Sequence, residues 1–181
     1  PKHSLKFNYG HYYQSPSPVW LINPGNKNLK AMLNRMGIIS WDYLPRKDIR
    51  FTMETYYKKY TDLPTGTLAG VNDHIVMTNT GSSYGGREDD FQSFGYFDLV
   101  SQAEGEAYGI EFLLQKKFSD IPLYGKASLS LGKSELTAGN KKVYPAAFDQ
   151  RVIFNLSGGY KFNSKWEVSG KFRYFSGIPF T

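Results

Sequence analysis

Histidines are the first residues to consider for catalysis or metal binding, and the chain has three of them. His3, His11 and His74 lie far apart in the sequence, and none has a second histidine or a cysteine at metal-ligand spacing. Tyr9 and Tyr13 occupy the positions two residues from His11, so no serine lies there to form a nucleophilic pair on one strand face. We therefore expect no catalytic residue, no metal site and no cofactor, although an enzyme whose nucleophile is assembled across several strands stays open as an alternative.

The segment 80–90 has two further features that could carry chemistry. Its glycine-rich part, TGSSYGG (80–86), is followed by neither Lys-Ser/Thr nor a helical pattern, so it is not a phosphate-binding loop. The carboxylates of Glu88, Asp89 and Asp90 could bind a divalent cation. An ordinary solvated turn explains those three residues better, and we expect no metal site there.

Aromatic side chains in the long polar segment 61–104 are suited to binding planar or sugar-like ligands by stacking and apolar contact. The candidate ligand contacts in this segment are Tyr84, Phe91, Phe94 and Tyr96. Arg151, in the motif FDQR next to another polar segment, is a further candidate for contact with a ligand or with another domain. The alternative is that the aromatic rings pack this segment against its neighbours.

The overall composition excludes several classes of protein. The net charge of +6 is moderate, and lysine and arginine are spread from Lys2 to Arg173 instead of clustering, so we expect no nucleic-acid partner. The absence of cysteine excludes disulfides and thiolate metal sites. No stretch approaches the roughly 18 consecutive apolar residues of a transmembrane helix. The start Pro1-Lys2-His3 has no apolar signal-peptide region.

Apolar and polar residues alternate along most of the chain, which predicts β-strands. The predicted strands are 5–14, 31–43, 48–60, 107–118, 123–131, 151–162 and 166–174. Strands in soluble proteins average about five or six residues, whereas a strand that crosses a bilayer needs about 9–11. These lengths favour membrane-spanning strands over a soluble β-sandwich, which is the alternative fold.

The predicted connections alternate between short and long, as in outer-membrane barrels. The short ones are 42–47, 119–121 and 163–164. The long ones are 15–28, 61–104 and 137–147. Aromatic residues gather at both ends of the predicted strands. They are Trp41, Tyr43, Phe118, Phe162 and Trp166 near the short turns, and Tyr13, Tyr57 and Tyr174 near the long loops. Two aromatic belts of this kind are typical of the two membrane interfaces.

The two parities of each predicted strand differ in polarity and are expected to face different surroundings. The residues expected to face lipid are Phe51, Met53, Tyr57, Phe154, Leu156, Val168 and Phe172. The charged residues expected to face a water-filled lumen include Arg50, Glu54, Lys58, Glu111, Lys126, Lys171 and Arg173. A wide lumen is polar in any such barrel, so a lumen-facing charge need not contact a ligand.

Three segments resemble parts of TonB-dependent outer-membrane receptors, in the same order along the chain. They are NKNLKAMLNRMGIISWDYLPRKDIRFTMETYYKKYTDLP (26–64), EGEAYGIEFLLQKKF (104–118) and YPAAFDQRVIFNLSGGYKFNSKWEVSGKFRYFSGIPF (144–180). The resemblance implies an all-β fold, a transmembrane antiparallel meander β-barrel. Residues 1–181 would supply about seven strands of a 22-stranded type of barrel, as a partial barrel domain with a long outer loop at 61–104. The family's plug domain and its closing strand are absent from this sequence, so we expect an internal part of a larger protein.

The resemblance also implies a function and partners. Proteins of this family take up a scarce or bulky ligand, such as a siderophore, haem, cobalamin, a glycan or a peptide, through a plugged barrel in the bacterial outer membrane. The expected partners are outer-membrane lipid and lipopolysaccharide, the N-terminal plug of the same full-length protein, and the energy-coupling TonB protein. The alternatives are a structural or adhesive outer-membrane barrel without transport, and an outer-membrane enzyme.

Overall fold

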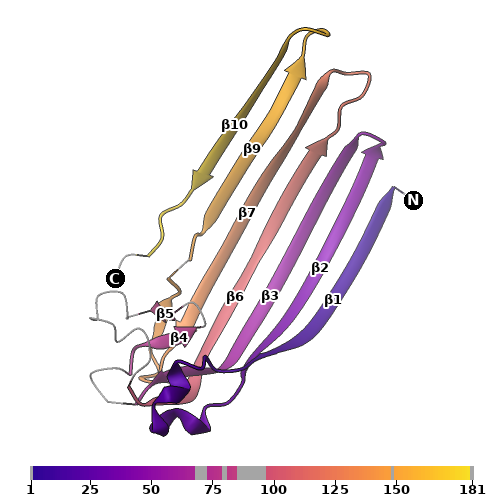
Figure 1. Ribbon diagram of the computed structural model, residues 1–181. Helices are drawn as coiled ribbons and strands as arrows, with labels where there is room; N and C mark the ends of the chain where they lie inside the picture. Colours follow the sequence, from indigo (N-terminus) through magenta and orange to yellow (C-terminus); the bar gives the residue numbers. More distant parts are fainter. Residues whose placement is uncertain (1, 68–72, 79–80, 85–96, 148, 180–181) are drawn as a thin grey trace.

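The computed structural model describes residues 2–67, 73–78, 81–84, 97–147 and 149–179, and in this part of the chain seven long strands form one antiparallel sheet (Figure 1). The long strands are β1 (His3–Gln14), β2 (Met32–Arg46), β3 (Ile49–Gly66), β6 (Leu99–Lys116), β7 (Leu123–Thr137), β9 (Val152–Lys161) and β10 (Glu167–Phe175). Each pairs with the next in the order β1-β2-β3-β6-β7-β9-β10. The predicted all-β antiparallel meander is therefore confirmed, as an open sheet whose edges are β1 and β10.

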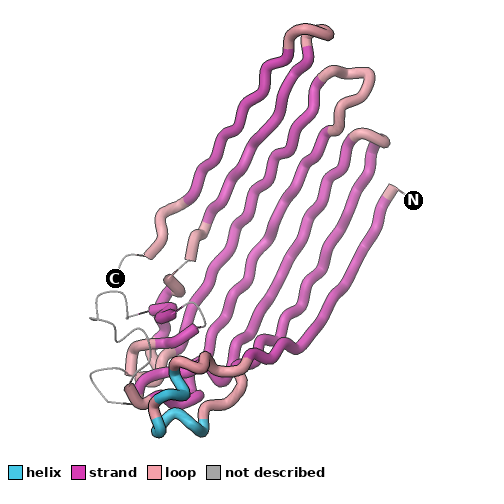
Figure 2. Tube along the Cα trace, in the orientation of Figure 1, coloured by secondary structure: helices cyan, strands magenta, loops and turns pink. Residues whose placement is uncertain are grey.

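The short turns lie at one end of the sheet and the long connections at the other (Figure 2). The short turns are 47–48, 117–122 and 162–166. The long connections carry five small elements. These are η1 (Trp20–Ile22), η2 (Pro24–Asn28), β4 (Val76–Thr78), β5 (Gly81–Tyr84) and β8 (Val143–Pro145). None of the helices in the described residues is long and apolar enough to cross a membrane.

The predicted long loop 61–104 is too long at both ends, because β3 runs to Gly66 and β6 begins at Leu99. The pairing of β3 with β6 shifts register between Tyr60 and Leu63, where Asp62 has a φ of 60°, a backbone conformation that aspartate tolerates better than most residues. This bulge breaks the alternation, and it lets the strand continue through Pro64. The observed turn 47–48 is likewise shorter than the predicted turn 42–47. Strand β2 continues to Arg46 through an irregularity in its pairing beside Pro45.

The strand register gives the sheet one apolar face. Residues that lie directly opposite on neighbouring antiparallel strands project from the same face. Met53 lies opposite Trp41 on β2 and opposite Phe112 on β6. Following such pairs across the sheet defines the apolar face. It contains Leu5, Phe7, Ile39, Trp41, Phe51, Met53, Tyr57, Phe112, Leu129, Phe154, Leu156, Val168 and Phe172. All seven residues expected to face lipid belong to it.

No second layer of the described structure covers the apolar face. Phe7, Leu114 and Phe172 are 70%, 49% and 57% exposed, although side chains of this kind are usually buried in soluble proteins. Neighbouring rings contact each other along the face, with ring centroids 6.4 Å apart for Phe51 and Phe112. An exposed apolar surface that crosses seven strands far exceeds the patches found on soluble monomers. The soluble sandwich is therefore disfavoured, because it would bury this face against a second sheet.

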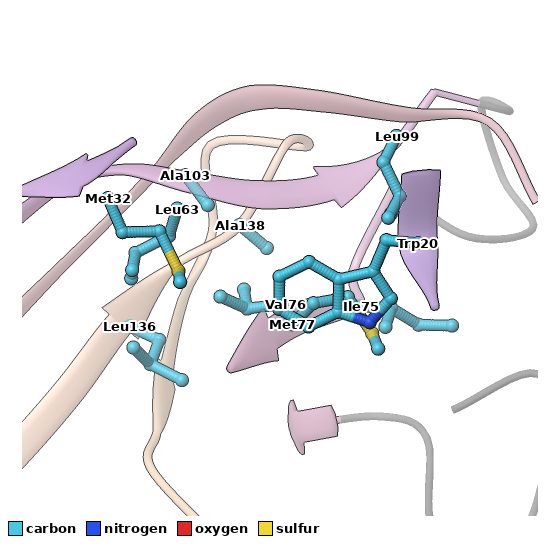
Figure 3. Packing of buried hydrophobic residues seen from close by; sticks show 10 residues of the cluster. All are labelled: Trp20, Met32, Leu63, Ile75, Val76, Met77, Leu99, Ala103, Leu136 and Ala138. Carbon is cyan, nitrogen blue, oxygen red and sulfur yellow. The ribbon is translucent and has the colours of Figure 1, made fainter. Parts of the chain in front are cut away.

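The buried hydrophobic residues gather at the end of the sheet with the long connections (Figure 3). This outer core comprises Trp20, Met32, Leu63, Ile75, Val76, Met77, Leu99, Ala103, Leu136 and Ala138. The buried Asn26 of η2 fastens it, since its side-chain amide donates to the carbonyls of Trp20 and Phe97 and accepts from the Leu99 backbone N–H. The loops that contribute to this core are therefore packed against the strand ends.

Tyr56 lies against two glycines of neighbouring strands, on the face opposite to the apolar one. A Cβ added at Gly109 or Gly132 would come within 2.8 Å or 2.9 Å of the Tyr56 hydroxyl oxygen. Replacing Gly132 by valine should therefore displace the ring and destabilise the folded protein by about 1–3 kcal/mol. Urea unfolding measures this change.

The control for Gly132→Val is Gly170→Val on the apolar face, because a Cβ at Gly170 meets nothing within 4 Å. In a Tyr56→Ala background the clash with the ring is absent. Gly132→Val should therefore destabilise that variant much less than it destabilises the wild type. Equal effects of valine at Gly132 and at Gly170 would show that the Tyr56 ring does not need these glycines.

Candidate functional site

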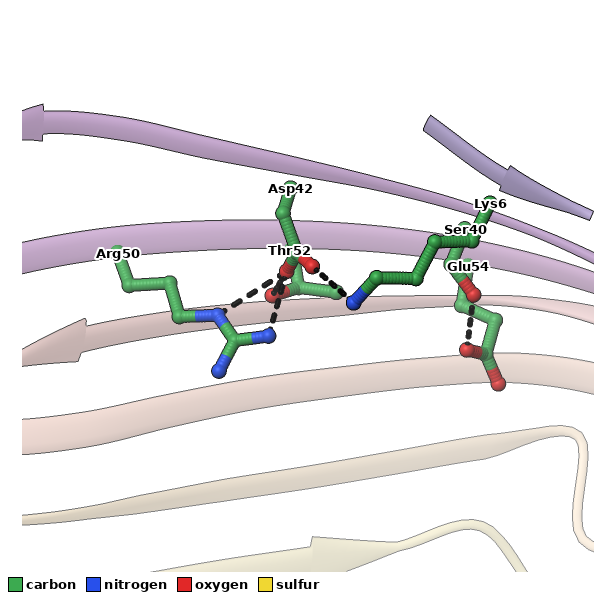
Figure 4. Close-up of polar contacts among 6 residues, drawn as sticks. All are labelled: Lys6, Ser40, Asp42, Arg50, Thr52 and Glu54. Atoms are coloured by element: carbon green, nitrogen blue, oxygen red, sulfur yellow. Dashed lines mark hydrogen bonds and ion pairs between the residues drawn. The ribbon is translucent and has the colours of Figure 1, made fainter. Parts of the chain in front are cut away.

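The face opposite to the apolar one is polar, and Asp42 of β2 forms its most connected group (Figure 4). The carboxylate of Asp42 is 5% exposed. It accepts hydrogen bonds from Thr52 Oγ1 at 2.6 Å, from Arg50 Nε and Nη2 at 3.0 and 2.7 Å, and from Lys6 Nζ at 2.9 Å. Asp42 therefore joins three neighbouring strands through one acidic group.

The residues expected to face the lumen all project from this polar face. Ser40 donates to Glu54 at 2.5 Å, and Ser130 donates to Glu111 at 3.1 Å. The Nζ of Lys58 lies 5.1 Å from the centre of the Tyr56 ring. The cross-strand pairings place the remaining predicted residues on the same face; these are Arg50, Lys126, Lys171 and Arg173.

Arg151 lies between β8 and β9, where its guanidinium is tied to a neighbouring carboxylate. Its Nε is 2.6 Å from Asp149 Oδ2, and the other carboxylate oxygen of Asp149 accepts from the Ser134 backbone N–H at 2.7 Å. Asp149 is 4% exposed. Arg151 therefore helps to fix the chain where it enters β9, and its predicted contact with a ligand stays a prediction.

The aromatic residues predicted to contact a ligand fall mostly outside the described residues. Phe91, Phe94 and Tyr96 lie outside them, and Tyr84 is the last residue of β5. Glu88, Asp89 and Asp90 also lie outside them. In the described part of the chain, no group of three or more histidine, aspartate or glutamate side chains is arranged to hold a metal ion.

A cavity of about 440 Å³ opens on the polar face beside the outer core. Tyr12, Asn34 and Tyr60 line it from β1, β2 and β3, and Met32 and Leu63 add apolar surface. The Oδ1 atom of Asn34 is buried, and it has no hydrogen-bond partner in the described part of the chain. A buried amide oxygen without a partner is costly, and a donor group on a bound molecule would satisfy it. Two rings, apolar surface and one free acceptor fit a small organic ligand.

This cavity was missed at the sequence level. Tyr12 and Tyr60 are 48 positions apart, and only the pairing of β1 with β2 and of β2 with β3 brings them to one place. The available signal was their shared parity, because both lie on the polar side of strands that end at the long connections. Asn34 gives no such signal, since its missing partner depends on three-dimensional packing.

The apolar face ends in charged residues towards the long connections. Lys59 Nζ is 2.8 Å from both Glu104 Oε2 and Glu106 Oε1, and Lys133 Nζ is 2.5 Å from Glu135 Oε1. Lys133 lies opposite Tyr108, and Lys59, Glu106 and Glu135 lie two residues further along their strands. From Ile49 to Tyr57, β3 covers about 26 Å at about 3.3 Å per residue. That length matches the apolar band of an outer-membrane barrel.

The carboxylate of Asp48, in the turn between β2 and β3, joins this turn to the next one. It lies 2.6 Å from Lys116 Nζ, 2.8 Å from Ser119 Oγ and 3.2 Å from Arg46 Nε. The hydrogen bonds from Lys116 and Ser119 lower the pKa of Asp48 from 3.8 to about 2. The ionised form is therefore favoured in the folded protein.

The lowered pKa of Asp48 predicts a pH-dependent contribution to stability. A carboxyl group with a lower pKa in the folded state stabilises it fully above its unfolded value, and the contribution is lost as the pH falls through about 4 towards 2. Asp48→Asn should therefore lower the urea midpoint at pH near 7, and the difference from the wild type should vanish near pH 2. A difference that persisted unchanged at low pH would contradict the ionic role of Asp48.

No family model matches the sequence, and no curated protein matches it. Among solved structures, the chain is similar to the FrpB iron transporter from Neisseria meningitidis (F3-3 variant), with a TM-score of 0.64, 14% sequence identity and 95% of this chain covered. The match covers 24% of the transporter's chain. The sheet therefore has the fold of a part of a TonB-dependent receptor barrel, and the predicted resemblance is confirmed at the level of the fold.

Proposed function

We propose that this chain forms part of the barrel wall of a TonB-dependent transporter in the bacterial outer membrane. The observation that carries the proposal is the uncovered apolar face that crosses seven strands, backed by a polar face. Lipid would cover the apolar face and water would fill the lumen beside the polar one. The length of the strands and the contrast between short turns and long connections support the same assignment.

On this proposal the short turns face the periplasm and the long connections face the cell exterior. The ion pairs of Lys59 and Lys133 would then lie at the level of the outer headgroups, next to lipopolysaccharide. The plug of the full-length protein would contact the polar face, and the TonB protein would act through that plug. The chain would be a transporter component and not an enzyme.

The cavity lined by Tyr12, Asn34 and Tyr60 is the ligand contact that we propose within the described residues. It lies at the exterior end of the polar face, where an arriving ligand would first meet the wall. A solved structure with the same fold is an iron transporter, which favours an iron-carrying ligand such as a siderophore or haem over cobalamin, a glycan or a peptide. Tyr84, Phe91, Phe94, Tyr96 and Arg151 remain candidate contacts in the neighbouring segments.

Uptake by cells that produce the full-length protein tests this function. Tyr60→Ala should reduce energy-dependent uptake of the transported ligand about tenfold, because the ring forms a wall of the cavity. The matched control is Tyr124→Ala, which removes a tyrosine from the polar face near the short turns. The transported ligand is identified by supplying iron siderophores, haem and cobalamin in turn. The variants are compared at equal amounts of the protein in the outer membrane.

Uptake that continued unchanged after inactivation of the TonB protein would contradict the proposal. Deleting residues 67–98 tests whether the long connection between β3 and β6 contributes to ligand binding, and unchanged uptake would contradict that role. These limits are chosen because residues 61–66 and 99–104 belong to strands. Normal insertion with no uptake of any ligand by the wild type would favour the second candidate, a structural or adhesive barrel. The outer core supports that candidate, since it holds the loops as a packed surface.

A further inference from the structure

A second cavity, of about 240 Å³, lies on the polar face at the end with the short turns. Four cationic side chains line it: Lys6 from β1, Lys47 from the turn after β2, Arg50 from β3 and Lys117 from the turn after β6. Ser4 and Gln115 add neutral hydrogen-bonding groups. Cations from four separate segments of the chain therefore meet around one space.

The two carboxylates that line the same cavity are already paired. Asp42 accepts from Lys6 and Arg50, and Asp48 is held by Arg46 and Lys116. Two of the four lining cations thus pair with Asp42, whereas Asp48 takes its partners from outside the lining. Lys47 and Lys117 have no ion-pair partner among the described residues. The cavity consequently has two more cations than anions along its lining.

Hydrogen-bond donors also remain in excess. A guanidinium has five N–H donors and an ammonium has three. Asp42 takes up the Nε and one terminal nitrogen of Arg50, and Figure 4 shows the other terminal nitrogen pointing away from Asp42. Lys47 and Lys117 are exposed residues, and their ammonium groups add further donors. Donors in this number, without matching acceptors, suit an anion that carries several oxygens.

We propose that this cavity binds a small multivalent oxyanion, with phosphate or carboxylate groups, between Arg50, Lys47 and Lys117. Asp42 holds Arg50 in place, so that part of the site is organised before binding. The cavity accommodates an anion the size of phosphate or citrate. This site lies at the opposite end of the polar face from the cavity of Tyr12 and Tyr60, and it does not depend on the proposed transport function.

Titration calorimetry on the protein in detergent micelles tests the site. Inorganic phosphate and citrate are titrated separately, at constant ionic strength in chloride, so that non-specific screening is held fixed. We expect one saturable site for at least one of the two anions, and the anion that binds identifies the phosphate or carboxylate source. Lys47→Gln/Lys117→Gln should weaken binding about tenfold, because two charge-assisted hydrogen bonds are lost.

The matched control is Lys161→Gln/Lys165→Gln. It removes the same charge at the same end of the sheet, outside the cavity, and should change the affinity less than about twofold. Circular dichroism checks that both double variants keep their strand content. The site is refuted if neither anion binds saturably to the wild type, or if both double variants weaken binding equally.

Discussion

Arginine in place of Leu129 should lower the free energy of unfolding of the protein in a phospholipid bilayer by about 2–4 kcal/mol. Leu129 lies at the middle of the apolar face, opposite Phe112 on β6 and Phe154 on β9. A charge at that depth would have to be desolvated or would draw water into the bilayer. The change is measured by urea unfolding of the protein in vesicles.

The neighbouring residue provides the control for Leu129→Arg. Ser128 projects from the polar face, opposite Leu113 and Asn155. Ser128→Arg places the same charge at the same depth, but towards water, and should cost less than about 1 kcal/mol. Equal costs at the two positions would mean that the two faces have the same surroundings, which the proposed barrel wall does not allow.

Asp42→Ala is the second substitution with a large expected effect, a destabilisation of about 2 kcal/mol. The alanine would leave Thr52, Arg50 and Lys6 without their shared acceptor and would leave two cations close together. The cost stays below that of a fully buried ion pair because Lys6 and Arg50 are 56% and 45% exposed and retain contact with water. Chemical unfolding in micelles measures the effect.

Asp42→Asn separates charge from hydrogen bonding at this position. The amide keeps one acceptor oxygen for Thr52 but loses the attraction to Arg50 and Lys6, so its cost should be intermediate. Asp62→Asn is the matched acidic control, since Asp62 has an ion pair with Lys30 at 3.6 Å and asparagine also tolerates the positive φ at this position. If Asp42→Asn were no more costly than Asp62→Asn, the charge of Asp42 would not stabilise the sheet.

The two faces of the sheet were predictable because a strand places alternate residues on opposite sides. Phe51, Met53 and Phe154 were assigned to the apolar face from parity alone, and the strand register agrees. The meander was also predictable, since short turns connect neighbouring antiparallel strands. These features depend on residues close together in the sequence.

Strand ends were predicted less well, because bulges shift the parity of a strand. Pro45 and Pro64 look like strand terminators, yet both lie inside strands where the pairing is irregular. At Asp62, the positive φ turns the following residues into the outer core, where Leu63 is buried. Alternation alone gives no sign of such a change, since the next residues still alternate in a new register.

The outer core and the two cavities needed the three-dimensional structure. Asn26 reads as a loop residue, but it bonds to Trp20, Phe97 and Leu99. The partners in these contacts lie up to 73 positions apart. The cationic cavity likewise joins Lys6 of β1 to Lys117 in the turn after β6, and β1 and β6 are not neighbours in the sheet. Local patterns do not encode which loops meet above a sheet.

A spin-label scan of β7 in reconstituted vesicles tests directly whether this sheet crosses the membrane. The chain has no cysteine, so each single cysteine introduced between residues 126 and 131 carries one nitroxide at a unique position. Labels at Ala127, Leu129 and Leu131 should be accessible to oxygen dissolved in lipid. Labels at the alternate positions, 126, 128 and 130, should be accessible to a water-soluble nickel chelate. An equal response of both sets to the nickel chelate would contradict a membrane-spanning wall.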